Sequence, residues 1–225
     1  LMSLKEAISE IHFPSNWDTL KKARYRLVFE ELLILQLRLR YSRVKLRSLK
    51  GIKHTLDTTL TDLLVKNLPF SLTEAQKKVI SQIEKDMVSE KIMYRLVQGD
   101  VGSGKTIVAA WALVKALSGG FQGALMAPTE ILAEQHYLSF QGLLKPLGIP
   151  VFLLTGNTSP SEKRDLIKGI SSGEIKLIIG THALIQEEVT FKNLGLIVID
   201  EQHRFGVNQR FALREKGSNP DVLIM

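Results

Sequence analysis

The chain has 225 residues, 44% of them hydrophobic and 24% charged, and this composition excludes an intrinsically disordered chain. It contains no cysteine, which excludes a disulfide framework and a thiolate metal site. Its apolar runs are too short to cross a bilayer, and its first ten residues hold two glutamates where a signal peptide would be apolar. We therefore expect a soluble, cytoplasmic globular protein.

The first fifty residues are basic and read as helical. They hold eleven Lys and Arg against five Asp and Glu, so they carry most of the formal net charge of +7. With Asp18 as N-cap and Gly51 as the stop, residues 22–50 form a predicted helix of roughly 40 Å. Residues 27–39 are apolar nearly all round and should pack against a partner. The helix also carries basic residues, which either touch phosphate or form a solvated face: Arg38, Arg40, Arg43, Lys45 and Arg47.

From about residue 60 onward, short apolar strands alternate with helices. The predicted strands are YRLVQ (94–98), GALMAP (123–128), VFLLTG (151–156), IKLIIGT (175–181), LGLIVID (194–200) and DVLIM (221–225), with helices predicted at 106–117 and 131–140. This alternation predicts an α/β fold with a mostly parallel, doubly wound sheet. Ligands bind such sheets at the carboxyl ends of the strands. Most of the predicted strands are followed by a polar or glycine-containing segment.

The segment GDVGSGKT, residues 99–106, fits the phosphate-binding loop pattern G-x-x-x-x-G-K-[ST] between a strand and a helix. Glycine allows backbone N–H groups to converge on phosphate oxygens, and the N-terminus of the helix adds partial positive charge. Lys105 is predicted to reach the β- and γ-phosphates, and the Thr106 hydroxyl to ligate Mg²⁺. The predicted nucleotide contacts within the loop are Gly99, Gly102, Ser103, Gly104, Lys105 and Thr106.

Asp200 and Glu201 stand together at the end of an apolar strand. A Mg²⁺ held by Thr106 and a nucleotide needs a carboxylate from a neighbouring strand, and Asp200 would supply it. Glu201 would then orient and polarise the attacking water. The competing interpretation is that the two carboxylates only cap the next helix.

Gln76 lies upstream of the loop in PFSLTEAQ. Its amide has the donor and acceptor needed to bind the adenine edge. Thr73 and Gln76 also fit a capping box, and the two roles are compatible.

Three further strand ends carry small, hydroxyl or amide residues, in APTEILAEQH, LTGNTS and GTHALIQ. Each on its own reads as a helix cap, for example Thr129 or Ser159. Their hydroxyl and backbone groups would also suit a phosphodiester chain.

The chain resembles the superfamily 2 helicases in the order of its motifs, which are Gln76, GDVGSGKT, APTEILAEQH, TG, GTHALIQ and DEQHRFGVNQR. The amino-acid sequences of these motifs resemble those of RecG-type helicases. The resemblance implies a RecA-like domain that uses ATP and Mg²⁺ and moves on branched DNA, such as stalled forks and Holliday junctions, in recombination and repair. It also implies a monomer associated with the bacterial nucleoid.

The resemblance assigns roles to individual residues. Gln76 would read adenine, Lys105 and Thr106 would contact phosphate and Mg²⁺, and Asp200 and Glu201 would be the Mg²⁺ carboxylate and the catalytic base. Gln202 and His203 would relay the nucleotide state, and the loop 204–210 would couple hydrolysis to DNA movement. The residues implied near DNA are Pro128, Thr129, Gly156, Thr181 and His182.

The resemblance also predicts the domain organisation. Residues 1–58 would be a helical linker from a DNA-binding wedge domain, and residues 59–225 the first RecA-like motor domain, without its C-terminal end. The wedge domain and a second RecA-like domain with the arginine fingers would lie outside this chain. Two alternatives remain: a translocase of the Mfd type acting on RNA polymerase, and an ATP-gated DNA-binding module without turnover.

Overall fold

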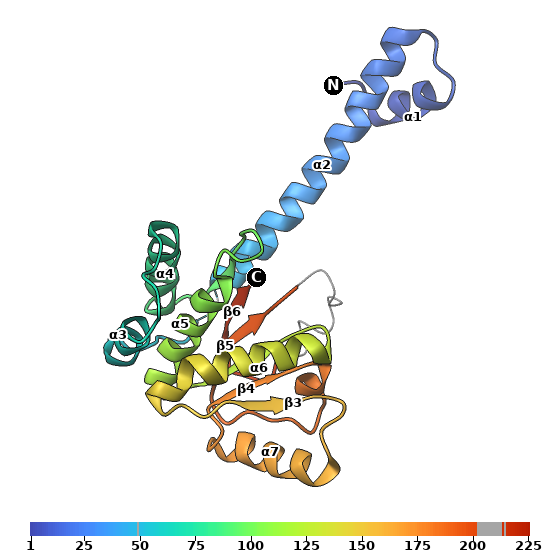
Figure 1. Cartoon of the computed structure of the whole chain (residues 1–225). Helices are drawn as coiled ribbons and strands as arrows, with labels where there is room; N and C mark the ends of the chain where they lie inside the picture. Colours follow the sequence, from blue (N-terminus) through green and yellow to red (C-terminus); the bar gives the residue numbers. More distant parts are fainter. Residues whose placement is uncertain (49, 202–212, 214) are drawn as a thin grey trace. The chain divides into compact units, whose positions relative to one another are not determined.

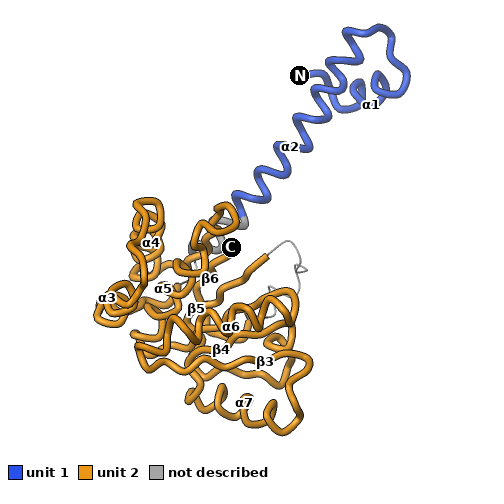
Figure 2. Tube along the Cα trace, viewed as in Figure 1, with its two compact units in different colours: residues 1–48 blue, residues 49–225 orange. Residues whose placement is uncertain are grey.

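The computed structural model describes residues 1–48, 50–201, 213 and 215–225, with backbone alone at 42, 43 and 45–48 (Figure 1). It divides into two compact units, residues 1–48 and 49–225 (Figure 2). The sequence-based division into a linker and a motor domain puts the boundary ten residues later, at 58/59, and that functional division remains a prediction.

The first unit consists of α1 (Leu4–His12) and α2 (Trp17–Ser48). Ser3 and Glu6 form a capping box at the start of α1, and Ala7 and Ala23 are fully buried where the two helices meet. The prediction that Asp18 caps the long helix is wrong. Asp18 lies in the first turn, and the Asn16 side chain accepts the N–H groups of Asp18 and Thr19, both at 3.0 Å.

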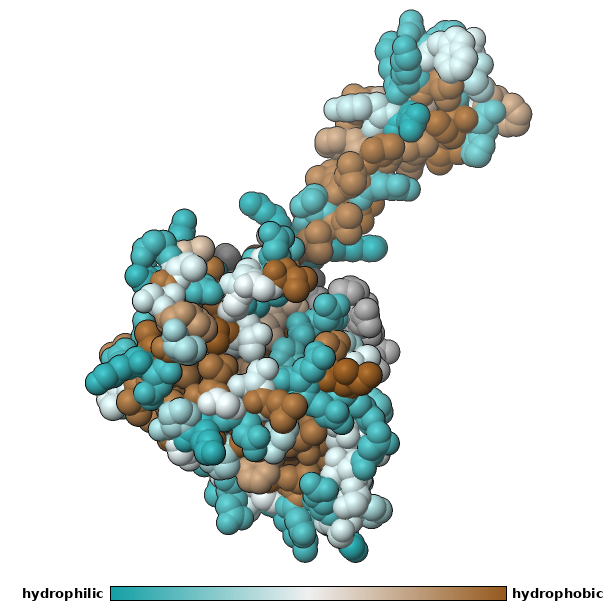
Figure 3. All heavy atoms as spheres, viewed as in Figure 1, coloured by the Kyte–Doolittle hydropathy of each residue, from teal (hydrophilic) through white to brown (hydrophobic). Residues whose placement is uncertain are grey.

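The apolar middle of α2 is exposed within this unit, and Figure 3 shows hydrophobic residues along it. Leu32 is 54% and Leu37 58% exposed, so the partner predicted for this stretch is not supplied by the residues of the first unit that the structure describes. The side chains of Arg38 and Arg40 are exposed as well.

The second unit is built on a six-stranded parallel sheet, and all six predicted strands are confirmed. The strands are β1 (Tyr94–Leu96), β2 (Gln122–Met126), β3 (Phe152–Leu154), β4 (Leu177–Gly180), β5 (Leu194–Ile199) and β6 (Asp221–Ile224). Their order across the sheet is β1-β6-β5-β2-β4-β3. The sheet is therefore the doubly wound α/β arrangement expected from the sequence.

Helices cover both faces of the sheet (Figure 1). They are α3 (Thr59–Lys66), α4 (Glu74–Met87), α5 (Lys105–Ser118), α6 (Glu130–Leu144) and α7 (Pro160–Ser172), with short 3₁₀ helices η1 (Lys145–Leu147) and η2 (His182–Ile185). Successive strand residues point to opposite faces. Leu125 and Val198 belong to the core that contains α5 and α6 residues, whereas Met126 and Ile197 belong to the core that contains α7 residues.

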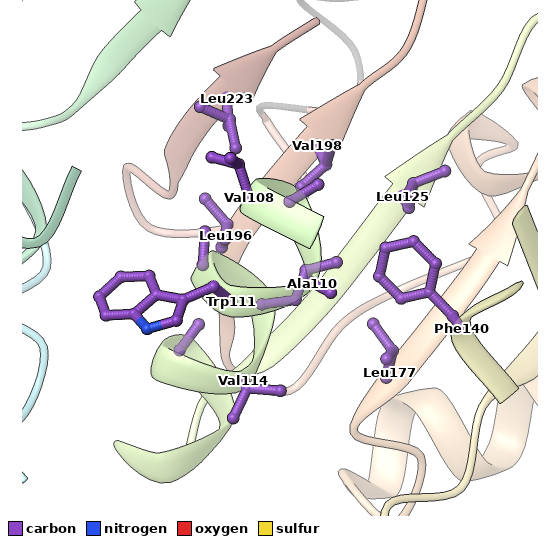
Figure 4. Close-up of a cluster of buried hydrophobic side chains, with 14 of the residues drawn as sticks. Val108, Ala110, Trp111, Val114, Leu125, Phe140, Leu177, Leu196, Val198 and Leu223 are labelled. Carbon is purple, nitrogen blue, oxygen red and sulfur yellow. The ribbon is translucent and has the colours of Figure 1, made fainter. Parts of the chain in front are cut away.

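The helix α5 is the most deeply buried helix of the unit. Every residue from Val108 to Ala116 is buried, and the close-up in Figure 4 shows Val108, Ala110, Trp111 and Val114 among side chains from the sheet and from α6. Because this helix begins at the end of GDVGSGKT, its burial fixes the position of that loop.

Buried polar groups hold the amino-terminal edge of the sheet. Gln122 donates to the carbonyls of Ile170 and Ile175 and accepts from the Asn193 N–H, at 2.7–2.9 Å. Residues 50–58 also belong to this edge: the N–H of Gly51 donates to Glu90 O at 2.9 Å.

Two buried titratable side chains from outside this segment, Lys115 and Asp221, contact it. Lys115 Nζ lies 3.1 Å from Asp57 O and 3.1 Å from Glu84 Oε1. His54 Nε2 lies 3.1 Å from Asp221 Oδ2, with both side chains inaccessible to solvent. The two side chains are thus in electrostatic contact. Burial raises the pKa of Asp221, and the contacts with His54 and the Met93 N–H oppose that rise.

The carboxyl-terminal edge is closed by backbone bonds between neighbouring strand ends. The N–H of Asp200 donates to Met126 O and that of Glu201 to Met225 O, both at 3.0 Å, and the N–H of Ala127 donates to Gly180 O at 2.9 Å. The predicted polar segments are therefore gathered along one edge. Among the described helices, none is both long and apolar enough to cross a membrane.

Candidate functional site

The loop GDVGSGKT runs from the end of β1 to the start of α5, so the predicted strand–loop–helix context is confirmed. Gly102 and Gly104 have φ of 82° and 81°, a backbone region that glycine adopts without strain. A Cβ at Gly104 would also collide with the Gln76 amide. The loop therefore needs glycine at both positions, and its turn is held by the Ser103 N–H, which donates to Asp100 O at 3.1 Å.

Lys105 is the first residue of α5 and is only half-buried. Its Nζ donates to the carbonyls of Gly99 at 2.7 Å and Asp100 at 3.0 Å. The loop thus curls around the ammonium group. These carbonyls are neutral acceptors, so a phosphate that enters the loop would bind the same cation more strongly. Thr106 follows at the second position of the helix.

Gln76 is tied to the same loop. Its Oε1 accepts the Thr73 N–H at 2.9 Å, and Thr73 Oγ1 accepts the Gln76 N–H at 3.2 Å, which confirms the capping box. Its Nε2 donates to Ser103 O at 2.9 Å. The amide therefore links the start of α4 to the phosphate loop, whereas its predicted contact with adenine remains a prediction.

Asp200 and Glu201 follow β5, two strand positions from β1, since only β6 lies between them. At about 4.8 Å per strand, the two carboxylates belong to the same stretch of edge as the loop. Glu201 has a φ of 55°, an unusual conformation for a side chain other than glycine, asparagine or aspartate. Such strain is common at functional sites. Gln202, His203 and the loop 204–210 lie outside the described residues.

A further residue joins this site from α6. His136 Nε2 lies 2.7 Å from Asp200 Oδ2, and the side chains are 13% and 17% exposed. Sequence reasoning missed this contact, although the histidine closes the quoted segment APTEILAEQH. The two residues are 64 positions apart, and their contact depends on which face of α6 lies against β5. No local sequence pattern predicts such a contact.

The residues predicted near nucleic acid lie at three neighbouring strand ends, with different exposure. Thr129 is exposed and caps α6 by accepting the Leu132 N–H at 3.3 Å. Gly156 and His182 are exposed, and Pro128 is half-buried. Thr181 is only 1% exposed, and its hydroxyl has no hydrogen-bond partner among the described residues. The backbone at this position is also bonded within the protein, since the Thr181 N–H donates to Leu154 O at 3.3 Å and its carbonyl accepts the Leu184 N–H at 3.1 Å.

The helix α6 is also joined to the loop after β3. Glu130, at its start, accepts hydrogen bonds from the backbone N–H of Asn157 at 3.2 Å and from the Asn157 side-chain amide. The same helix therefore contacts the Gly156–Asn157 turn at one end and Asp200 through His136.

Residues 73–219 match the family described as DEAD/DEAH box helicase. The chain belongs to this family. The matched range begins at the Thr73–Gln76 capping box and includes the phosphate loop and Asp200–Glu201. The matched range therefore contains the residues of the site described above.

The chain is similar to RecG proteins over its whole length, which confirms the expected resemblance. It is 50% identical over 225 residues to the ATP-dependent DNA helicase RecG of Thermotoga maritima, covering 100% of this chain and 29% of the relative. The RecG of Bacillus subtilis is 47% identical over 221 residues, covering 98% and 32%. This chain thus spans about a third of the length of its relatives.

A solved structure of RecG bound to a three-way DNA junction superposes with a TM-score of 0.85 at 48% identity, covering 100% of this chain and 30% of that one. The helicase MrfA, at 19% identity and a TM-score of 0.58, shares the fold. Because the similar relatives are RecG proteins, the alternative of a translocase acting on RNA polymerase is not favoured.

Proposed function

We propose that this chain is the ATP-binding part of an ATP-dependent DNA helicase that remodels branched DNA in recombination and repair. The observation that carries the proposal is that GDVGSGKT, Asp200 and Glu201 all follow strands at the same edge of the parallel sheet. The RecG relatives and the RecG structure with a three-way junction support the same function. Such a protein would act at the bacterial nucleoid.

The donor set at this edge fits Mg²⁺ held together with a nucleotide. Thr106 and Asp200 offer a hydroxyl and a carboxylate, the hard oxygen ligands that Mg²⁺ prefers. The described residues contain no group of three or more His, Cys, Asp or Glu that could hold an ion alone. Phosphate oxygens and water would therefore complete the coordination, and the cation would neutralise charge on the β- and γ-phosphates.

The other residues of the site have distinct roles in hydrolysis. The backbone N–H groups of the loop and the N-terminus of α5 hold phosphate oxygens. Lys105 exchanges its bonds to Gly99 and Asp100 carbonyls for bonds to the phosphates. Gln76 ties α4 to the loop through Ser103 O, and its amide would also bind the adenine edge. Glu201 orients the attacking water as the catalytic base.

Complete catalysis would need groups from elsewhere in the protein. In motors of this type, arginines supplied from outside the nucleotide-binding domain stabilise the transition state and are worth at least about 10³-fold in rate. This chain spans 29% of the Thermotoga maritima relative, so a second RecA-like domain and a DNA-binding wedge domain would supply the remainder. We expect the isolated chain to bind ATP weakly and to hydrolyse it very slowly as a monomer.

The test is Mg-ATP hydrolysis by this chain, with and without forked DNA, beside Glu201→Gln and with ATP binding measured in parallel. We expect ATP to bind and turnover to be negligible in every sample. DNA-stimulated turnover that Glu201→Gln abolishes would mean that the chain is catalytically complete, contrary to the proposed division of labour. Absence of nucleotide binding would contradict the proposed function itself.

A further inference from the structure

The contact between His136 and Asp200 is the starting observation. It joins the middle of α6 to the end of β5 at a distance of 2.7 Å. Both side chains are more than four-fifths buried, so water competes poorly for this bond. A carboxylate only accepts, so the Nε2 of His136 is the donor.

The backbone of Asp200 is already fixed, because its N–H donates to Met126 O at 3.0 Å. Its carboxylate still has two side-chain torsions to restrict. The bond from His136 restricts these torsions, because it fixes one carboxylate oxygen and thereby orients the other. A carboxylate has two oxygens with several acceptor positions, so accepting from His136 is compatible with ligating a cation.

The imidazole is itself held in place. Its ring lies edge-on to the ring of Phe140, one helical turn further along α6, with centroids 6.4 Å apart. Phe140 is fully buried in the core that also contains Leu177. The position of Nε2 is therefore set by the packing of α6 on the sheet.

Partners that orient a ligating side chain typically change metal affinity by 10–100-fold when they are removed. We propose that His136 is a positioning residue that holds the Asp200 carboxylate for Mg²⁺ in the nucleotide complex. The inference rests on the proposed function of the site. It assigns His136 no contact with nucleotide and no role in proton transfer.

The experiment is a Mg²⁺ titration at a fixed concentration of the fluorescent nucleotide mant-ADP, with a second measurement of mant-ADP binding in EDTA. The variants are His136→Ala, His136→Gln, which places an amide N–H near the position of Nε2, and Gln135→Ala, an exposed neighbour on the same helix that serves as the control. Thermal unfolding without nucleotide shows whether each variant is folded.

We expect His136→Ala to raise the Mg²⁺ midpoint about tenfold while binding in EDTA is unchanged. His136→Gln should restore most of the shift, and Gln135→Ala should behave like the parent chain. An unchanged midpoint in His136→Ala, or an equal loss with and without Mg²⁺, would overturn the inference and leave a packing role. If His136→Ala does not fold, His136→Phe replaces it in the comparison with His136→Gln.

The outcome also separates this inference from the proposed function. If the parent chain and the His136 variants bind mant-ADP with the same dependence on Mg²⁺, only the proposed role of His136 is contradicted. If the parent chain does not bind mant-ADP at all, both the role of His136 and the proposed function are contradicted.

Discussion

Both edges of the parallel sheet carry titratable side chains, but these side chains are bonded in different ways at the two edges. At the amino-terminal edge, Lys115, His54 and Asp221 are buried and are paired with other groups of the protein. At the carboxyl-terminal edge, Lys105, Asp200 and Glu201 are only partly buried. The first arrangement maintains the fold, whereas the second keeps its side chains partly accessible at the edge where we propose that the nucleotide binds.

Two lysines on the same helix show the difference. Lys105 begins α5 and bonds two loop carbonyls that a phosphate could replace. Lys115 lies ten positions further on, is fully buried and bonds Asp57 O and Glu84 Oε1. The same type of side chain thus has a proposed role in ligand binding at one end of the helix, and attaches residues 50–58 at the other.

The largest expected effect comes from exchanging each lysine for alanine. Lys115→Ala should lower the free energy of unfolding by about 3 kcal/mol, because it removes a fully buried side chain, opens a cavity and breaks the bonds to Asp57 O and Glu84 Oε1. Lys105→Ala should leave stability within about 0.5 kcal/mol, but weaken mant-ADP binding by at least about tenfold. Urea unfolding and fluorescence titration of both variants measure this contrast. Equal losses of stability would contradict the distinction between the edges.

A smaller effect is expected at Gln76, which combines the two kinds of role. Gln76→Ala and Thr73→Ala each break part of the cap of α4 and should each cost about 1 kcal/mol. Only Gln76→Ala also removes the bond to Ser103 O and the proposed adenine contact, so it alone should reduce the preference for ATP over GTP, by about fivefold. Competition of ATP and GTP with mant-ADP measures that preference, and an unchanged ratio would limit Gln76 to capping.

The smallest effect is a pH dependence at the amino-terminal edge. Because burial raises the pKa of Asp221 above its ordinary value of 3.8, the folded state binds more protons than the unfolded state between these two values. The contribution of Asp221 to stability should therefore fall as the pH rises through that window and be level above it. Asp221→Asn cannot ionise and should lack this slope.

The measurement is the difference in unfolding free energy between the parent chain and Asp221→Asn from pH 4 to pH 8. Subtracting the variant cancels the titration of the other carboxylates to first order. A difference that stays constant with pH would mean that burial of Asp221 does not alter its protonation.

The part of the site that is local in sequence could be predicted. GDVGSGKT defines its own turn, and the six strands follow from short apolar runs ending in polar residues. Because the carboxyl ends of parallel strands lie at the same edge of a sheet, the strand prediction also placed Asp200 at the edge that carries Lys105. The Thr73–Gln76 cap was likewise visible as a four-residue pattern.

What could not be predicted depends on how distant elements pack. His136 reaches Asp200 only because of the rotation of α6 on the sheet, and His54 reaches Asp221 across 167 positions of the sequence. The wrong assignment of Asp18 has a local cause: Asn16 is an equally good cap two residues earlier, and sequence alone does not rank them. The burial of Thr181 likewise emerges only from the fold.

The double attachment of α6 has a consequence for energy transfer. Glu130 ties one end of the helix to Asn157, near residues predicted to meet DNA, and His136 ties its middle to Asp200. If DNA binds at those predicted residues and tilts the helix, both contacts would change together. Thermodynamic linkage would then make the effect reciprocal: the factor by which DNA alters Mg-nucleotide affinity would equal the factor by which Mg-nucleotide alters DNA affinity.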